Sequence, residues 1–400
     1  MSEWKKCPIG EVVTLRQGFA INAKSKHYMS KEETSLPLLR IADMKNGTKE
    51  VFVKEEIPQR FIAHPEDIIY TRTGNVGLVF RNNYGVMHNN CFSVTPNDAD
   101  ELSRDFLYYA LQNKTFFDTA NVLARGAAQP DLPHTSFNSI EFAYPSLFAQ
   151  ERIANILSRY DSLIENYQKQ IKLLEEAARR LYKEWFVDLH FPGYENTKIV
   201  DGLPEGWEKK KVREIGKVIT GKTPSTSKKE YYGGQIPFIT IPDMHTGIYP
   251  TSSQFLSDLG ANSQSGKFIP ANSLMVSCIG TAGLVCITKE ECQTNQQINS
   301  LVLNDNSLLY YMYNTFLSLK EHLNNIGSNG ATMTNVNKSK FESIEILIPN
   351  NSISNLYNKA VEQSFRGIKT LSSQICLLTE ARDRLLPKLM SGDIKIESLK

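Results

Sequence analysis

The side chains in this sequence that could do chemistry are scattered hydrogen-bond donors rather than the clustered groups of a catalytic centre. A methyltransferase needs a cofactor loop of the F-x-G-x-G kind and an N-P-P-Y-like base pocket, and neither string occurs. No G-x-x-x-x-G-K-[ST] loop is present to hold ATP. The dipeptides Pro130-Asp131 and Pro242-Asp243 could begin a nuclease motif, but neither has an acidic-x-Lys partner at useful spacing. These absences favour a binding protein over an enzyme.

The six cysteines give no sign of a metal site or a disulfide framework. They include no C-x-x-C pair, and no histidine lies at metal-ligand spacing from them. We therefore expect reduced thiols, no bound metal and no cofactor held by this chain. The cysteines are Cys7, Cys91, Cys278, Cys286, Cys292 and Cys376.

Donors of the kind that read base edges in DNA grooves occur in loop-like stretches of both halves of the chain. Each of them could equally be a solvated or turn-forming polar residue. The candidates in the first half are Arg40, Lys45, Arg72, Thr73, Asn75, Arg81, Asn89, Asn90, Arg125 and Gln129. The candidates in the second half are Lys222, Lys228, Lys229, His245, Thr281, Asn295, Gln296, Gln297, Asn329 and Thr332.

Two glycine turns with the pattern G-x-x-G-L-V lie among these candidates, at 74–79 and 280–285. Exposed backbone N–H groups without side chains could cradle a phosphate there. The alternative is a tight turn between two strands. Arg72 and Thr73 beside the first turn, and Thr281 within the second, add weight to a contact with DNA.

The sequence segments that should position these residues occur twice along the chain. Five blocks recur in the same order, so the sequence is a tandem duplication of roughly 200 residues. The matched blocks are 9–18 with 215–224, 36–44 with 236–244, 68–80 with 274–287, 107–111 with 309–313, and 136–146 with 340–350. The segments RGAAQ (125–129) and SNGAT (328–332) occupy equivalent places but differ in chemistry, which makes them the best base-reading candidates.

Each half ends in a long stretch whose apolar side chains step by four and three residues. This spacing is typical of the a/d seam of a coiled coil. Shared identities between 171–181 and 375–385 favour two copies that pair with each other over two unrelated amphipathic helices. The first seam is Ile153, Leu157, Tyr160, Ile164, Tyr167, Ile171, Leu174, Ala178, Leu181 and Trp185. The second is Tyr357, Val361, Ser364, Ile368, Leu371, Ile375, Leu378, Arg382, Leu385 and Leu389.

The globular parts between these helices predict an α+β fold with a mostly antiparallel or mixed sheet, since no alternating β-α-β rhythm is present. The expected strands are 38–41, 68–71, 78–80, 238–241, 274–278 and 284–288, and the expected helices are 101–113 and 306–324. The expected division is 1–145 for the first globular domain, 146–190 for its helix, 191–206 for a linker, 207–349 for the second domain and 350–392 for its helix. The helices should run antiparallel, with a pseudo-two-fold axis between the halves. Pro387 should end or kink the second helix within 385–393.

Charge and hydropathy limit the kind of partner. The net charge of the 400 residues is +2 and stays near zero in each half. A protein that held DNA alone through phosphate neutralisation would be more basic, so any basic surface must be local or shared with other subunits. No apolar run reaches 18 residues, and MSEWKKCPIG lacks a signal-peptide core, so a cytoplasmic location and no membrane partner are expected.

The order of blocks resembles that of the specificity (S) subunit of type I restriction-modification enzymes. The resemblance covers essentially the whole chain, although the first domain lacks the proline and glycine that precede Trp207. Gln150-Glu151-Arg152 also has no counterpart in 350–359. The stretches that carry it are Trp4, LPEGW (203–207), the two G-x-x-G-L-V turns, 131–157, RRLYKEWFVDLHFPGY (179–194) and RLLPKLMSGDI (384–394).

The resemblance implies a subunit without catalysis of its own. Each target-recognition domain would read one half of a bipartite, asymmetric double-stranded DNA target, and the helices would set the gap between the halves. Two methyltransferase (M) subunits carrying S-adenosylmethionine would dock on the helices. Two ATP- and Mg-dependent motor-nuclease (R) subunits would join for cleavage. Unlike sequences in the two domains fit an asymmetric target, because identical readers would require a palindrome.

Two other classes of protein remain open from the residues alone. One is a coiled-coil scaffold that presents two ligand-binding domains unrelated to DNA, and the other is a nuclease or methyltransferase acting alone. Among single residues, the tyrosines at 108, 109, 310 and 311 are interpreted as core aromatics on helices. His134 is interpreted as a helix-entry residue with Thr135 or Ser136 as the cap.

Overall fold

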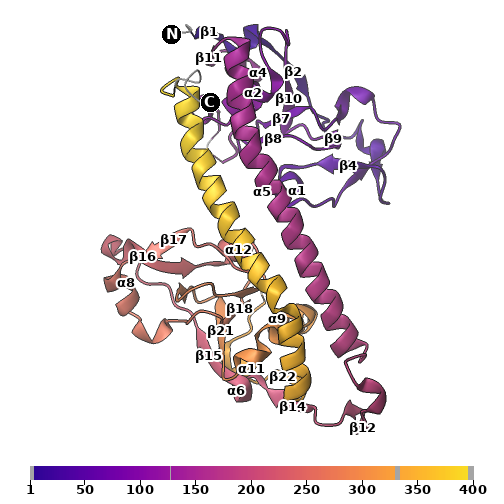
Figure 1. Ribbon diagram of the computed structural model, residues 1–400. Helices are drawn as coiled ribbons and strands as arrows, with labels where there is room; N and C mark the ends of the chain where they lie inside the picture. The colour runs from indigo at the N-terminus through magenta and orange to yellow at the C-terminus, as the bar shows by residue number, and fades with distance from the viewer. Residues whose placement is uncertain (1–3, 127, 329–333, 395–400) are drawn as a thin grey trace. The chain divides into compact units, whose positions relative to one another are not determined.

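The computed structural model describes residues 4–126, 128–328 and 334–394, which form two compact units. Unit 1 comprises the residues up to Leu163 together with those from Thr379 onward, and unit 2 is Ile164–Leu378. The two longest helices, α5 (Leu147–Tyr182) and α12 (Asn351–Met390), each contribute a stretch to both units. Each unit is therefore a globular part packed on segments of both long helices (Figure 1).

Unit 1 is built on a four-stranded antiparallel sheet in the order β2-β10-β7-β8. A second, mixed sheet has the order β3-β5-β4-β9-β6, and β1 pairs with β11. The strands are β1 Lys5–Pro8, β2 Val13–Gln17, β3 Met29–Ser30, β4 Leu36–Leu39, β5 Phe52–Val53, β6 Ile62–Ala63, β7 Ile68–Thr71, β8 Val79–Phe80, β9 Gly85–Met87, β10 Cys91–Pro96 and β11 Glu141–Tyr144. The short helices are α1 Ile41–Asn46, α2 Arg104–Ala110, α3 Lys114–Leu123 and α4 His134–Asn138.

Unit 2 repeats this plan. Its four-stranded sheet has the order β15-β21-β18-β19, its second sheet the order β17-β16-β20, and β14 pairs with β22. The strands are β12 Ile199–Val200, β13 Leu203–Pro204, β14 Glu208–Lys211, β15 Gly216–Thr220, β16 Tyr232–Ile239, β17 Gln254–Leu256, β18 Leu274–Ser277, β19 Val285–Ile287, β20 Gln293–Thr294, β21 Ile298–Leu303 and β22 Glu345–Ile348. The short helices are α6 Val212–Ile215, α7 Ile241–Met244, α8 Asp258–Asn262, α9 Leu309–Ser318, α10 Lys320–Ser328 and α11 Lys338–Glu342.

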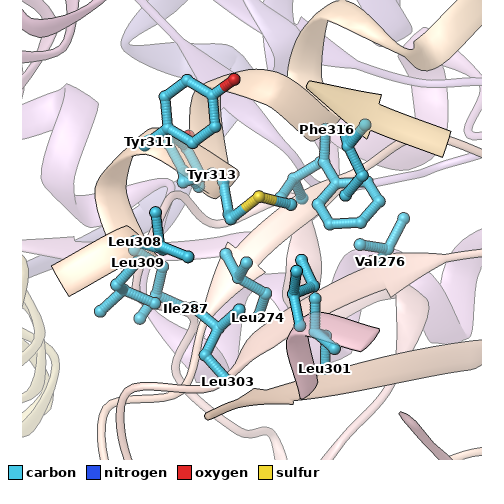
Figure 2. Packing of buried hydrophobic residues seen from close by; sticks show 14 of the residues in the cluster. Leu274, Val276, Ile287, Leu301, Leu303, Leu308, Leu309, Tyr311, Tyr313 and Phe316 are labelled. Atoms are coloured by element: carbon cyan, nitrogen blue, oxygen red, sulfur yellow. The ribbon is translucent and has the colours of Figure 1, made fainter. Parts of the chain in front are cut away.

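The inner strands β7 and β18 are buried along their whole length, which explains why they are almost continuous apolar runs. In unit 2, Leu274 and Val276 of β18 face the helical layer, whereas Met275 joins Ile239 in a separate cluster under the second sheet. Figure 2 shows Leu274, Val276, Leu301 and Leu303 packed against side chains of α9. In unit 1, Ile68 and Tyr70 of β7 pack with α2 in the same way, and Ile69 faces the other side.

The long helices run antiparallel within each unit. In unit 2 the Tyr357 hydroxyl donates to the Ala178 carbonyl at 3.2 Å, and Gly367 lies against Leu174. Residue numbers therefore increase in opposite directions along the two helices. In unit 1 the first turns of α5, at Ile153 and Leu157, share a core with the last turns of α12. All twenty positions of the two predicted seams are buried or half-buried.

The structure corrects the local prediction at the ends of two strands. Ile41 and Ile241 were expected to close strands, but each begins a short helix, α1 and α7. In the second case the Asp243 carboxylate accepts from both the backbone N–H and the hydroxyl of Thr240, at 2.8 and 2.7 Å, which caps the helix. The repeated A-D-M and P-D-M strings are therefore helix starts rather than strand ends.

Three other local expectations can be compared with the structure. Helix α12 continues through Pro387 and ends at Met390, within the segment where the sequence places its end. His134 does begin a helix, but the cap is Pro133 and no side chain caps it, so the predicted role of Thr135 or Ser136 is wrong. Tyr109 and Tyr311 are buried on α2 and α9, as predicted for core aromatics. No helix in the described part of the chain has the length and apolar character needed to cross a bilayer.

Candidate nucleic-acid interface

A polar cluster lies at one edge of the central sheet of unit 1. Gln17 ends β2 opposite Phe92 at the start of β10, and Thr71 ends β7 opposite Cys91. Because these strands are antiparallel, the residues after β2, after β7 and before β10 meet at the same edge. The loop that precedes α4 joins them there through an isolated bridge between Thr73 and Asp131.

Asp131 holds this cluster together. Its carboxylate accepts from Arg72 Nη2 at 2.7 Å, from Arg72 Nε at 3.2 Å and from Thr73 Oγ1 at 2.5 Å. Arg72 Nη1 also donates to Gln17 Oε1 at 3.2 Å, and the Gln17 amide donates to the Asn89 carbonyl at 2.7 Å. Burial acts to raise the pKa of Asp131, but the hydrogen bonds from Arg72 and Thr73 outweigh it and the pKa is lowered. The carboxylate is therefore charged and fixes the Arg72 guanidinium in one orientation.

Unit 2 builds the equivalent edge with the same backbone hydrogen bonds. Gly74 N–H donates to the Pro130 carbonyl at 2.8 Å in unit 1, and Gly280 N–H donates to the Thr334 carbonyl at 3.1 Å in unit 2. Likewise, Arg72 N–H donates to the carbonyl of Asn90, and Cys278 N–H donates to the carbonyl of Gln297, both at 2.8 Å. Isolated bridges join Thr73 to Asp131 and Ile279 to Asn335, so Asn335 occupies the place of Asp131.

The side chains on this shared backbone differ in charge. Where unit 1 has the Arg72 and Asp131 ion pair, unit 2 has Cys278 and Asn335. Thr220 Oγ1 donates to Asn299 Oδ1 at 2.6 Å, and the Asn299 amide donates to the Val336 carbonyl at 3.1 Å. The edge of unit 1 is thus ordered by an ion pair, and that of unit 2 by hydroxyls and amides, with Lys267 Nζ donating to the Thr220 carbonyl at 2.9 Å.

The glycine turns connect β7 to β8 and β18 to β19, as expected for strand-to-strand turns. The second glycine of each turn is required for two reasons, a left-handed backbone and a lack of space for a side chain. Gly77 has φ of 94°, and a Cβ there would lie 2.5 Å from the Phe117 ring. Gly283 has φ of 90° and lies against Lys320. A Cβ on Gly74 would meet no atom within 4 Å, and one on Gly280 would meet the Gln297 amide at 3.8 Å. The exposed tips are Asn75 and Thr281. The phosphate-cradle interpretation stays a prediction.

The structure gathers seven of the first-half candidates around Asp131. Arg125 N–H and the Asp131 carbonyl are joined at 2.8 Å, and the reverse bond has the same length. Asn75, Arg125 and Gln129 are exposed there. The gathered residues are Arg72, Thr73, Asn75, Asn89, Asn90, Arg125 and Gln129.

The other first-half candidates lie elsewhere. Arg40 is paired with Asp43 and Glu50. Burial, and to a smaller extent the charge of Arg40, lowers the pKa of His88 in the loop before β10. Lys45 is exposed on α1. Arg81 is engaged within the protein, against Tyr108 and Asp161, and we leave it out of the interface.

The second-half candidates are more dispersed. Thr281 and Gln296 are exposed at the edge, and Lys222 is exposed nearby, its N–H bonded to the Thr294 carbonyl at 2.9 Å. Asn295 is buried and turns its amide toward the side chain of Gln297 in its own loop. Lys228 is exposed and donates to the Tyr231 hydroxyl at 3.0 Å, and His245 is exposed at the end of α7. Asn329 and Thr332 lie outside the described residues.

Sequence reasoning missed the residues that organise the two edges, namely Gln17 and Asp131 in unit 1 and Thr220 and Asn299 in unit 2. Gln17 and Thr220 lie within the matched blocks 9–18 and 215–224, whereas Asp131 and Asn299 lie outside the matched blocks. Asn299 pairs with Thr220 where Phe92 pairs with Gln17, so no shared sequence pattern marks these residues. Among the described residues, no group of three or more His, Cys, Asp or Glu side chains could hold a metal ion.

Comparison with known proteins places these features in a family. The family model for the type I restriction modification DNA specificity domain matches residues 1–176 and 204–376. The type I restriction enzyme HindI specificity subunit of Haemophilus influenzae is 30% identical over 477 residues, covering 98% of this chain and 100% of that protein. The MjaIX specificity subunit of Methanocaldococcus jannaschii is 29% identical over 319 residues, covering 77% of this chain and 72% of the relative.

A solved structure agrees with the fold. The crystal structure of the type I restriction-modification S subunit from M. genitalium superposes with a TM-score of 0.60 at 17% identity. The match covers 97% of this chain and 96% of that one. At this identity the likeness shows the fold alone, and the two chains share that fold over nearly their whole length.

Proposed function

Because the chain belongs to the type I restriction-modification DNA specificity family, as a DNA-recognition subunit without catalysis of its own, we propose that each unit reads one half of a bipartite, asymmetric DNA target. The observation that carries the proposal is the pair of matched sheet edges. One backbone frame recurs in both units, and it carries an ion-paired arginine in unit 1 where unit 2 has amides and hydroxyls. Two readers of the same shape but different chemistry suit a target whose halves differ.

In unit 1 the reading groups are guanidinium and amide donors. Arg125 and Gln129 are exposed beside Arg72, which Asp131 and Gln17 hold in place. Guanidinium pairs best with the O6 and N7 acceptors of guanine, and carboxamides pair with adenine. Holding Arg72 before DNA arrives reduces the entropy lost on binding.

In unit 2 the reading groups at the sheet edge are amides and hydroxyls, with Lys222 exposed nearby. Gln296 is exposed and accepts from Thr223 at 2.6 Å, and Thr281 is exposed at the tip of the neighbouring turn. Amide and hydroxyl groups can discriminate bases by hydrogen bonding while contributing little to phosphate neutralisation. The net charge of +2 fits this arrangement, because partner subunits would supply the remaining basic surface.

The helices α5 and α12 would serve as the spacer and the docking site for partners. Helix α12 has 40 residues. At about 1.5 Å per residue it is long enough to extend well past one helical turn of DNA, which is roughly 34 Å. We propose that two methyltransferase subunits carrying S-adenosylmethionine bind these helices. Two ATP- and Mg-dependent motor-nuclease subunits would complete the enzyme.

A domain exchange tests independent reading. Residues 1–145 are replaced by the corresponding region of another specificity subunit, and the chimaera is expressed with its methyltransferase subunit. Methylome sequencing should then report a new sequence in one half-site and the parent sequence in the other. A change in both halves would contradict the proposal. Absence of salt-dependent DNA binding by the complete methyltransferase would instead support a scaffold unrelated to DNA.

Insertion of one heptad after Gln168 tests the spacer role. Seven residues preserve the a/d seam and lengthen the helix by about 10 Å. The insertion should change the accepted gap between half-sites and leave both half-site sequences as they were. An unchanged gap would show that the helices do not set it.

A further inference from the structure

A single carboxylate on α5 receives donors from three other elements of unit 1. Asp161 Oδ1 accepts from Arg382 Nη1 of α12 at 2.7 Å. Asp161 Oδ2 accepts from the Tyr109 hydroxyl of α2 at 2.6 Å and from Arg81 Nη2, which follows β8, at 3.4 Å. The side chains of Asp161, Arg81 and Arg382 are between 21% and 26% exposed, so the group is shielded but not sealed from water.

Arg81 and Tyr109 belong to the globular part and reinforce each other. The Arg81 guanidinium lies 4.1 Å from the Tyr108 ring centre and donates to the Tyr109 hydroxyl at 3.1 Å. Burial, together with the hydrogen bond to Asp161, raises the pKa of Tyr109, so the hydroxyl stays protonated and donates. The recognition domain therefore contacts α5 through directional bonds at this place.

Arg382 belongs to the helix pair and occupies a seam position where the pattern calls for an apolar side chain. A polar residue at such a position favours one register of two helices at some expense of stability. Arg382 Nε and Nη2 donate to Asp383 Oδ1 on the same helix at 3.0 and 2.8 Å, so the bond that depends on register is the one from Nη1 to Asp161. Its bond to Asp161 thus ties the register of α12 on α5 to the same carboxylate that receives the recognition domain.

We propose that Asp161 is a positioning residue for DNA recognition, which fixes the orientation and register of the first recognition domain on the helix pair and thereby limits the gap that the subunit accepts. This inference rests on the proposed function, since it presumes two half-sites at a set separation. Hydrogen bonds and ion pairs lose their energy when their angles change, whereas apolar contacts tolerate sliding. A polar junction therefore restricts rotation and translation of the domain more tightly than packing alone.

The experiment uses the complete methyltransferase with the full-length specificity chain. Sites that keep both half-site sequences but have one base pair more or less in the gap are compared with the parent site. The measured quantity is the ratio of methylation rates, altered gap over parent gap. The parent protein must first show bipartite methylation with one preferred gap, and if it does not, the proposed function fails before the variant is examined.

The first variant is Asp161→Asn, which retains the shape and removes the charge. The ratio should rise about tenfold or more, corresponding to roughly 1.4 kcal/mol of lost discrimination. Both half-site sequences should stay the same. An unchanged ratio in a folded variant would overturn the proposal, and so would a changed base preference in the first half-site, because Asp161 would then act on base reading.

A second variant separates positioning from structural support. Arg382→Met places an apolar side chain at the seam, which should maintain or raise the stability of the helix pair. If Asp161 and Arg382 only support the fold, the ratio should not move in this variant; the proposal expects the same rise as in Asp161→Asn. The matched control is Asp105→Asn, which removes the exposed partner of Arg81 on α2 at 3.5 Å and touches neither long helix. The control should leave the ratio unchanged.

Discussion

The two recognition domains contact the long helices at equivalent positions of the duplicated sequence, but the side chains at these positions differ in chemistry. In the alignment of 171–181 with 375–385, Asp161 corresponds to Phe365 and Arg382 to Ala178. In unit 1 the ring of Tyr108 is covered by the Arg81 guanidinium, 4.1 Å from its centre. In unit 2 the equivalent ring of Tyr310 is covered by Phe365, stacked at 4.1 Å and 15°. The tyrosine is present in both units, but the group packed on its ring is the Arg81 guanidinium in unit 1 and the Phe365 ring in unit 2.

The two junctions are held by different interactions, apolar burial in unit 2 and directional polar contacts in unit 1. Phe365 is 1% exposed and belongs to the large core of unit 2, so its contribution is mainly removal of apolar surface from water. Asp161 and its partners are partly exposed, so they contribute less to stability and more to geometry. The sheet edges differ in the same sense: unit 1 has an ion pair where unit 2 has hydroxyls and amides, on a backbone with matching hydrogen bonds.

The largest effect is expected from Phe365→Ala. Truncating a fully buried phenylalanine costs about 3–5 kcal/mol of unfolding free energy, because the lost transfer energy adds to that of the cavity. Urea unfolding followed by tryptophan fluorescence should report this through Trp207, which lies in the same core. The control is Leu377→Ala on the same helix, 65% exposed, which should change stability by less than about 0.5 kcal/mol. Equal effects from the two substitutions would contradict the assignment of Phe365 to the core.

The glycine turns allow a test within a single turn of unit 1. Gly77→Ala forces a Cβ within 2.5 Å of the Phe117 ring at a φ of 94°, so backbone strain and overpacking should together cost about 2–4 kcal/mol. Gly74→Ala has a similar φ of 81° but open space, and should cost only about 1 kcal/mol. The measurement is the difference in unfolding free energy. The interpretation of the second glycine as a packing requirement would be wrong if the two variants were equally stable.

The duplication, the long helices and the class of fold could be predicted from sequence because they are periodic or repeated. The apolar steps of the seam survive in both copies, and the matched blocks mark the strands. The capping of α7 by Asp243 and the role of Asp131 could not, because each depends on one side chain meeting a backbone group or a distant arginine. Arg81 illustrates the limit: its type suggested a base reader, but only the fold places it against Tyr108 and Asp161.

A smaller effect should follow when unit 1 is given the neutral chemistry of unit 2. Asp131→Asn removes the partner of Arg72, and because the carboxylate is 40% exposed the loss of stability should be at most about 1 kcal/mol. Arg72 would be less restrained, so discrimination among bases of one half-site should fall by about 1–3 kcal/mol. Methylation rates of single-base variants of both half-sites measure this. Asn335→Asp is the reciprocal control in unit 2, and loss of discrimination in both half-sites by Asp131→Asn would contradict independent reading.

The smallest effect concerns pH, and it also follows from the unlike residues of the two edges. Burial and a neighbouring arginine lower the pKa of His88 and of His134 in unit 1. The unfolded chain therefore binds protons that the folded chain does not once the pH falls below about 6.5, so stability is complete above that pH and declines below it. Asn295, which does not titrate, occupies in unit 2 the position of His88 in unit 1. The His88 N–H donates to the Leu39 carbonyl and the Asn295 N–H to the Ile239 carbonyl, each at the end of a matched strand. His88→Asn should thus flatten the decline in unfolding free energy as the pH falls below about 6.5. A decline as steep as that of the parent would mean that His88 takes up its proton equally in both states.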